Sequence, residues 1–271
     1  MAATVRLPAV AGTFYPGDPA ALAAAVIKYL AEANPPPLKN VRAVIAPHAG
    51  YVYSGLTAGY AFKSLQSSLP GDDVTIYLLG PAHQVWFNGV STGDFEGFST
   101  PLGVAPVDQE RVQALWALKT HYQGLPAAHQ GEHCLEVELP FLQHIAPQLR
   151  LVPLLFGEVD ACAVGRELAY RLRDEPDARV VVSSDLSHFH DYNTARRLDR
   201  AFLQHVLDGE VAKVAGAQRR ACGKAAIVAL MEMAAELSWT AHFLDYRTSG
   251  DTAGDKRRVV GYAAIAFTQG D

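Results

Sequence analysis

Three histidines in this 271-residue chain follow apolar runs that are typical of strands buried on both faces. The runs, each with its histidine, are VRAVIAP (41–47) with His48, VTIYLLG (74–80) with His83, and ARVVVSSD (178–185) with His188. Ligands of open α/β sheets bind outside the carboxyl ends of the strands. We therefore expect the three imidazoles to line one pocket, because recurrence at equivalent positions favours a functional site over three separate structural histidines.

Metal binding and proton transfer are the two chemistries that imidazole supplies near neutral pH. A metal needs about three protein ligands, so a further donor must come from elsewhere in the chain. Cys222 is the leading candidate, because it opens a predicted helix and follows Arg219 and Arg220. A helix N-terminus and nearby cations lower the pKa of a thiol and favour the thiolate that metals require. The alternative is a small buried cap, and the residue alone does not decide between the two.

A second histidine pattern points to a different class of enzyme. His129, Glu132 and His133 match the H-x-x-E-H pattern of a zinc protease family. That pattern needs both histidines on one helical face, and Gly131 interrupts the helix. We therefore do not expect a protease. A helix that begins near Glu132 would instead direct its first turn, with His133 and Glu136, toward the pocket as hydrogen-bonding support.

Strand and helix patterns alternate along most of the chain. Strands are predicted at 41–47, 74–80, 149–156 and 178–185 and in the segments TAHFLDYRT and RVVGYAAIAF. Helices are predicted at 18–33, 55–65, 108–119, 133–146, 160–173, 193–207 and 222–237, and hairpin-like excursions at 85–107. This alternation predicts one α/β domain over residues 1–271, with a mainly parallel or mixed central sheet flanked by helices.

The composition argues against several classes of protein. The formal net charge of −5 lacks the basic excess that nucleic-acid binding requires. Cys134, Cys162 and Cys222 show no paired spacing, which indicates a reducing compartment instead of a disulfide framework. The N-terminal segment lacks the layout of a signal peptide, and the apolar run at 20–27 is too short to span a bilayer. We expect a cytoplasmic protein that binds neither nucleic acid nor membrane.

Seven sequence blocks closely resemble those of the Memo-like family. In chain order they are LPAVAGTFYPGD, IAPHAGYVYSG, LLGPAHQV, EHCLEVELPFL, VVSSDLSHF, ACGKAAI and DYRTSGDTAGD. The resemblance covers nearly the whole chain, from about residue 6 to 268. Bacterial and archaeal members of this family are called AmmeMemoRadiSam system protein B. The resemblance implies a fold like that of the class III extradiol dioxygenases, which are non-haem iron enzymes.

The resemblance also implies roles for the residues of the pocket. His48 and His83 match two histidine ligands of the metal, and Cys222 takes the position of the third ligand. His188 matches a histidine that acts as acid and base. Asp185 belongs to the same Ser-Asp-x-x-His block and could orient His188.

Four further residues are expected around these ligands. Phe14 matches an aromatic position at the rim of the pocket, and Tyr51 lies in the same block as His48. His133 and Glu136 are expected to support the ligands from outside. Cys134 stands where many relatives carry serine, a small departure from the family pattern.

The thiol of Cys222 separates this chain from the dioxygenases, which hold Fe(II) with two histidines and a glutamate. A thiolate is softer and itself oxidisable, which shifts the preference toward copper(I) or zinc. We therefore expect a mononuclear transition metal, with iron(II) or copper ahead of zinc, and leave open whether the chain is an enzyme.

Two classes of function fit this pocket. The first is an oxidoreductase that acts on a small unknown substrate. The second is a non-catalytic binding, scaffold or copper-handling protein that recognises a small molecule or peptide. The family name also implies AMMECR-type and radical SAM proteins as partners.

Overall fold

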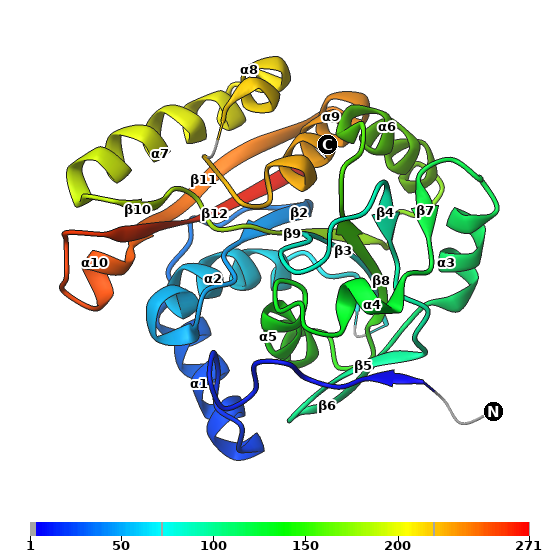
Figure 1. The fold of residues 1–271 in the computed structure, drawn as a ribbon, viewed down its shortest axis with the longest axis horizontal. Helices are drawn as coiled ribbons and strands as arrows, with labels where there is room; N and C mark the ends of the chain where they lie inside the picture. Colours follow the sequence, from blue (N-terminus) through cyan, green and yellow to red (C-terminus); the bar gives the residue numbers. More distant parts are fainter. Residues whose placement is uncertain (1–3, 72, 219, 271) are drawn as a thin grey trace.

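The central sheet of the protein is mixed, with parallel strands at its centre (Figure 1). The computed structural model describes residues 4–71, 73–218 and 220–270. In spatial order, the parallel strands are β2 (Val41–Ala46), β9 (Arg179–Ser183), β3 (Thr75–Pro81) and β8 (Arg150–Phe156). They correspond to the four buried strands predicted from apolar runs. Ile45 and Leu79 both pair with Val182, so β2, β9 and β3 end at the same edge of the sheet.

Antiparallel strands extend this parallel centre. The two C-terminal strands, β11 (Trp239–Thr248) and β12 (Val259–Gln269), pair with each other, and β12 also pairs with β2. Three short strands complete the sheet: β4 (Val90–Ser91), β7 (Tyr122–Gln123) and β10 (His188–His190). The sequence did not predict β10, because three residues are too few to show a hydrophobic period.

Helices cover both faces of the central sheet (Figure 1). One face carries α1 (Pro19–Glu32), α2 (Tyr51–Gln66) and α5 (Leu139–Ile145). The other carries α6 (Ala161–Leu172), α7 (Tyr192–Leu207), α8 (Val211–Gly216) and α9 (Lys224–Leu237). Short helices in the connections are α3 (Gln109–Trp116), α4 (Pro126–His129) and α10 (Ser249–Thr252). The predicted α/β class, with a mixed sheet between helical layers, is confirmed.

A smaller sheet lies beside the central one. Strands β5 (Gly97–Thr100) and β6 (Gly103–Pro106) form the hairpin that the sequence predicts, and β1 (Val5–Arg6) pairs parallel with β5. This pairing ties the N-terminal segment to the middle of the chain.

Three predicted helix starts were wrong. Helix α2 begins at Tyr51 instead of near residue 55, because Gly50 caps it without a side chain that the sequence could reveal. The helix expected at 133–146 is a 3₁₀ turn, η1 (Glu136–Glu138), followed by α5 with Pro140 in its first turn. Helix α9 begins at Lys224, so Cys222 precedes it instead of opening it. Within the described ranges, no helix has both the length and the apolar character needed to cross a membrane.

Candidate metal centre

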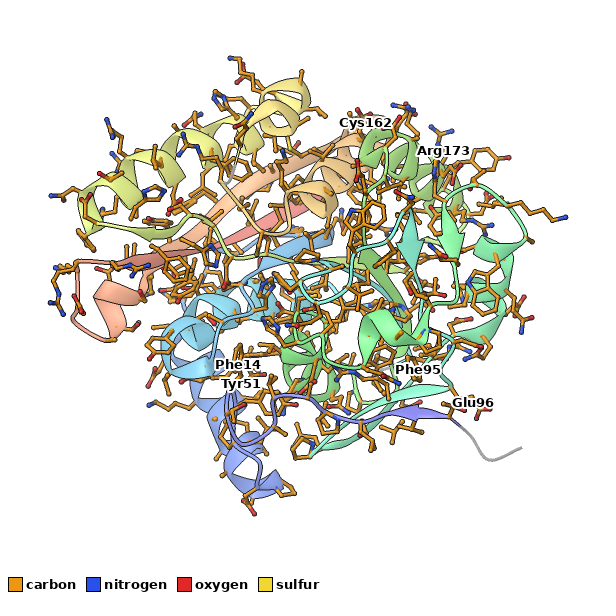
Figure 2. The ribbon with its side chains drawn as sticks, viewed as in Figure 1. Phe14, Tyr51, Phe95, Glu96, Cys162 and Arg173 are labelled. Carbon is orange, nitrogen blue, oxygen red and sulfur yellow. The ribbon has the colours of Figure 1, made fainter. Side chains whose placement is uncertain are left out.

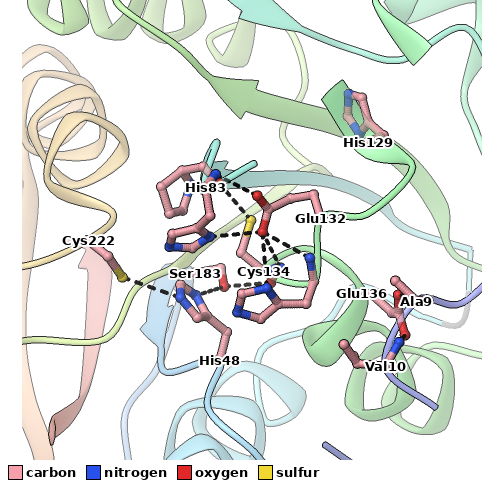
Figure 3. A network of polar contacts seen from close by, with 12 residues as sticks. Ala9, Val10, His48, His83, His129, Glu132, Cys134, Glu136, Ser183 and Cys222 are labelled. Atoms are coloured by element: carbon pink, nitrogen blue, oxygen red, sulfur yellow. Dashed lines mark hydrogen bonds and ion pairs between the residues drawn. The ribbon is translucent and has the colours of Figure 1, made fainter. Parts of the chain in front are cut away.

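Three side chains meet beyond the carboxyl edge of the parallel strands (Figure 3). His48 follows β2, His83 follows β3 and Cys222 precedes α9. One potential ligand atom from each residue lies within 4.8 Å of the other two, and Cys222 Sγ is 3.3 Å from His48 Nε2. His48 is buried, whereas the His83 side chain is 28% exposed, so the cluster is open on one side. Two imidazoles and a thiol at this spacing fit a transition-metal ion.

Backbone contacts after β9 place Cys222 opposite His48. The Asp185 N–H donates to Cys222 Sγ at 3.2 Å, and the Cys222 N–H donates to the Asp185 carbonyl at 3.2 Å. The Gly223 N–H donates to Ser184 Oγ at 3.0 Å. A Cβ at Gly223 would stand only 2.6 Å from the Cβ of Ser184, so this close approach requires glycine.

The pKa of the Cys222 thiol is not lowered, contrary to the prediction. Burial, reinforced by the nearby Asp185 carboxyl, raises this pKa to about 12. Arg219 lies outside the described residues, and Arg220 lines a different cavity with His205. The thiol of the metal-free protein is therefore protonated at neutral pH, and a bound metal would have to displace that proton.

An ionised carboxylate holds His83. Glu132 Oε1 accepts from His83 Nδ1 at 2.9 Å and from the N–H groups of His133 and Cys134 at 2.9 and 3.0 Å. Glu132 Oε2 accepts from the His83 N–H at 2.6 Å. Burial opposes ionisation of Glu132, but the bonds from His83 outweigh it and lower the pKa to about 2. Because Nδ1 is engaged, the Nε2 lone pair of His83 is left for a metal.

A hydroxyl group holds His48. Ser183 Oγ lies 2.7 Å from His48 Nδ1, so the Nε2 of His48 is likewise left facing Cys222. The same Oγ lies 2.7 Å from the carbonyl oxygen of Cys134 and 2.8 Å from Glu138 Oε1. Burial lowers the pKa of His48 well below its usual range, so this imidazole is neutral and able to bind a metal.

Asp185 supports His48, whereas we expected it to orient His188. Its Oδ1 accepts from the His48 N–H at 3.0 Å, while His188 Nδ1 contacts the carbonyl oxygen of Leu186 at 2.8 Å. The Leu186 carbonyl, and not Asp185, therefore orients the His188 ring. Burial raises the pKa of the Asp185 carboxyl to about 7.

His188 lies on the wall of a cavity of about 530 Å³ that also reaches Cys222. The remaining lining residues are Leu186, Phe189, His190 and Ala221. Burial lowers the pKa of His188, and its Nδ1 contact leaves Nε2 as the free nitrogen. The geometry therefore brings His188 to the same cavity as one of the three candidate ligands.

Two further expected residues, Phe14 and His133, also lie at this centre. The His133 ring stacks on His83, with centroids 5.0 Å apart, and meets His48 edge-on at 5.4 Å. The Phe14 ring meets the His133 ring edge-on, with centroids 5.0 Å apart. The Tyr51 N–H donates to the Phe14 carbonyl at 2.7 Å, which fixes the segment that carries Phe14 (Figure 2).

Tyr51 and Glu136 lie farther from the ligands than expected. The Tyr51 ring is buried against Phe141, and its hydroxyl donates to the Val137 carbonyl at 2.8 Å. Tyr51 therefore packs α2 on α5.

Glu136 binds the N-terminal segment. Its carboxylate pairs with Arg6 and accepts from the N–H groups of Ala9 and Val10 at 2.6 and 3.0 Å and from the Tyr15 hydroxyl at 2.5 Å. Its side chain points away from the ligands because these N-terminal donors surround it (Figure 3).

Sequence reasoning missed three residues that hold the ligands, namely Glu132, Ser183 and Glu138. One signal was present, because both acidic residues belong to the apolar block EHCLEVELPFL, where an unpaired charge would be unfavourable. Ser183 ends a buried strand and shows no such signal.

Two alternative arrangements of ligands are less suited to a metal. Glu132, Cys134 and His83 also lie within 4.8 Å of one another, but Glu132 accepts four N–H groups and Cys134 Sγ contacts the Pro81 carbonyl at 3.1 Å. His129, the first residue of the protease-like pattern, is buried with its Nε2 on Ser91 Oγ and lies apart from the centre (Figure 3).

Comparisons with known proteins agree with the motifs. The family model described as "Memo-like protein" matches residues 6–266. A "MEMO1 family protein" of Archaeoglobus fulgidus is 36% identical, covering 97% of this chain and 99% of its own length. One from Aquifex aeolicus is also 36% identical, with the same coverage of both chains. A solved structure of an uncharacterized protein from Escherichia coli K12 aligns with a TM-score of 0.48 at 13% identity, over 83% of this chain and 99% of that one. The family match and the two relatives show that this chain belongs to the Memo-like protein family.

Proposed function

We propose that this chain binds one transition-metal ion through His48, His83 and Cys222 and uses it to oxidise or reduce a small ligand. The observation that carries the proposal is the convergence of three ligand atoms within 4.8 Å of one another. Both histidines have Nδ1 engaged by other side chains, which is the usual arrangement around a metal-binding imidazole.

The identity of the metal follows from the donor types. Iron or copper would supply one-electron redox chemistry, and the exposed side of His83 gives a ligand access to the ion. A thiolate favours copper(I) and zinc more than the carboxylate of a dioxygenase-like site does. Because the proposed function needs a redox-active metal and zinc has no redox chemistry, we place iron(II) and copper first and zinc after them.

His188 is the group that we propose moves a proton. It faces the cavity that reaches Cys222, and its free Nε2 can accept a proton from a ligand hydroxyl or return one. The Asp185 carboxyl accepts from the His48 N–H, and the Asp185 N–H donates to Cys222 Sγ. We therefore propose that Asp185 positions His48 and Cys222 relative to each other.

The substrate and the partners follow only from family resemblance. Class III dioxygenases act on phenolic rings, so catechols and other phenols are the first substrates to test. AMMECR-type and radical SAM proteins are the partners that the family name suggests.

The second candidate function is copper handling without turnover. Cys222 favours it, because a thiolate is a soft ligand that suits copper(I). The pKa of this thiol is raised by burial, so the bound metal has to displace its proton.

Anaerobic reconstitution tests both functions. The protein is loaded with Fe(II) or with Cu(I), analysed for metal content, and then exposed to oxygen with catechols or other phenols. We expect one equivalent of metal in the wild type and in the control Cys162→Ser, whose thiol lies on α6, and a large loss in His48→Ala and Cys222→Ser. Metal bound without oxygen uptake would favour copper handling, and full metal content in both ligand variants would overturn the proposed centre.

A further inference from the structure

The hydroxyl of Ser183 has more hydrogen-bond neighbours than its single proton can serve. His48 Nδ1 and the Cys134 carbonyl oxygen both lie at 2.7 Å, and Glu138 Oε1 lies at 2.8 Å. A serine hydroxyl donates once and accepts up to twice. All three contacts are therefore satisfied only if two of the three neighbours donate to Ser183.

The chemistry of the neighbours decides which of them donate. The Cys134 carbonyl can only accept, so the Ser183 proton belongs to that contact. His48 Nδ1 then carries a hydrogen and donates to Ser183, which leaves Nε2 facing Cys222. The contact to Glu138 needs a proton as well, and the carboxyl group itself is its remaining source.

The surroundings of Glu138 favour a carboxyl group without charge. Glu138 and its chain neighbours Val137 and Leu139 are all buried, and among the described residues Oε2 of Glu138 has no hydrogen-bond partner. An ionised carboxylate would leave that oxygen charged and unpaired in an apolar setting, which is strongly unfavourable. Burial raises the pKa of Glu138 well above its usual range; the contact with Ser183 lowers it by less, and the Asp185 carboxyl adds to the rise.

We propose that Glu138 is a neutral carboxylic acid that donates its proton to Ser183 and thereby positions His48. Among the described residues, the hydrogen bond of its side chain is to Ser183, and Glu138 does not line the cavity beside Cys222, so it is a positioning residue that acts through Ser183. Its protonation is a property of the fold alone, whereas its effect on metal binding rests on the proposed function.

Infrared spectroscopy of the metal-free protein tests the protonation directly. At neutral pH, the wild-type minus Glu138→Gln difference spectrum is expected to contain the carbonyl band of a protonated carboxyl group. Glu175 accepts bonds from Tyr77 and Arg111, so the matched control Glu175→Gln should lose only ionised-carboxylate bands. A Glu138 difference spectrum that contains only ionised-carboxylate bands would overturn the proposal. This readout needs neither metal nor turnover, so it is independent of the proposed function.

Zinc affinity tests the positioning. The Gln side chain of Glu138→Gln can donate an N–H to Ser183, so this variant should bind zinc within about threefold of the wild type. Glu138→Leu cannot donate and should bind zinc about 10- to 100-fold more weakly, a typical effect of losing a residue that orients a metal ligand. In a Ser183→Ala background, Glu138→Leu should have no further effect on zinc affinity.

Three results would contradict the positioning role. They are equal weakening of zinc binding in the Gln and Leu variants, unchanged zinc binding in Glu138→Leu, and additive effects of Glu138→Leu and Ser183→Ala. Urea unfolding of each metal-free variant separates loss of zinc affinity from loss of the fold.

Discussion

His83 and His48 face the same centre, but carboxyl groups of opposite character hold them in place. Glu132, behind His83, only accepts hydrogen bonds, and its pKa is lowered to about 2. Glu138, behind His48 through Ser183, is buried with a raised pKa and is proposed to donate. The two candidate ligands are therefore not equivalent, because one imidazole contacts a charged carboxylate and the other a network that we propose is neutral.

This asymmetry has a chemical consequence. An ionised carboxylate on Nδ1 makes an imidazole a stronger donor to a metal, whereas a neutral hydroxyl does so less. His83 is also the more exposed of the two ligands. The exposed ligand is therefore expected to bind the metal more strongly and the buried ligand to fix its position.

The largest difference in zinc affinity is expected between Glu132→Gln and Glu138→Gln, which make the same substitution behind the two histidines. Four N–H groups donate to the Glu132 carboxylate, so the NH₂ of Glu132→Gln would face a donor and break at least one of these hydrogen bonds. We expect zinc affinity to fall about 10- to 100-fold in Glu132→Gln, measured by competition with a chelator. Glu138→Gln serves as the matched control, and equal losses in the two variants would remove the asymmetry.

The pH dependence of unfolding should also differ in sign between the two groups. The pKa of Glu132 falls from 4.5 to about 2 on folding, so it stabilises the metal-free protein by roughly 3 kcal/mol above pH 4.5 and loses this as the pH falls toward 2. The pKa of Glu138 is raised on folding, so this group stabilises the folded protein at low pH. That contribution is lost as the pH rises toward the raised pKa.

Urea unfolding of the metal-free variants measures this difference. The stability gap between wild type and Glu132→Gln should close as the pH falls from about 5 toward 2. Relative to the wild type, Glu138→Gln should gain stability as the pH rises above the ordinary range of a glutamate, because the buried Glu138 carboxyl group resists ionisation. Parallel pH profiles for the two variants would mean that both carboxyl groups ionise alike.

The smallest effect on zinc affinity is expected from Phe14→Leu, at the rim of the pocket near His83. Phe14 packs on His133, which stacks on His83, and an aromatic pair of this kind contributes about 0.5–1.5 kcal/mol. Phe14→Leu should therefore weaken zinc binding by about tenfold at most, less than Glu132→Gln does. Isothermal titration with zinc measures it, and an effect as large as that of Glu132→Gln would assign Phe14 a more direct part.

Local patterns in the sequence predicted the central sheet and the strand-end histidines, and the family resemblance supplied the three candidate ligands. Apolar runs marked the parallel strands, and the register of β2, β9 and β3 brings the strand-end residues together. The supports of the ligands could not be predicted in the same way. Glu132, Ser183 and Glu138 reach His83 and His48 through contacts between distant segments, and nothing in their neighbours along the chain shows which ligand each one holds.

The thiol shows a second limit of sequence reasoning. Local charges predicted a lowered pKa for Cys222, but burial against Asp185 raises it. Burial depends on the packing of α9 against β9, which the local sequence does not contain.

Anaerobic titration with Co²⁺, followed by optical absorption, shows whether Cys222 binds a metal together with His48 and His83. We predict one equivalent of cobalt in the wild type, with a thiolate-to-cobalt charge-transfer band that disappears in Cys222→Ser and persists in Cys134→Ser. Cys134 is the matched control because it belongs to the alternative cluster with His83 and Glu132. A band that survives in Cys222→Ser and disappears in Cys134→Ser would contradict the centre formed by His48, His83 and Cys222 and assign the metal to that cluster.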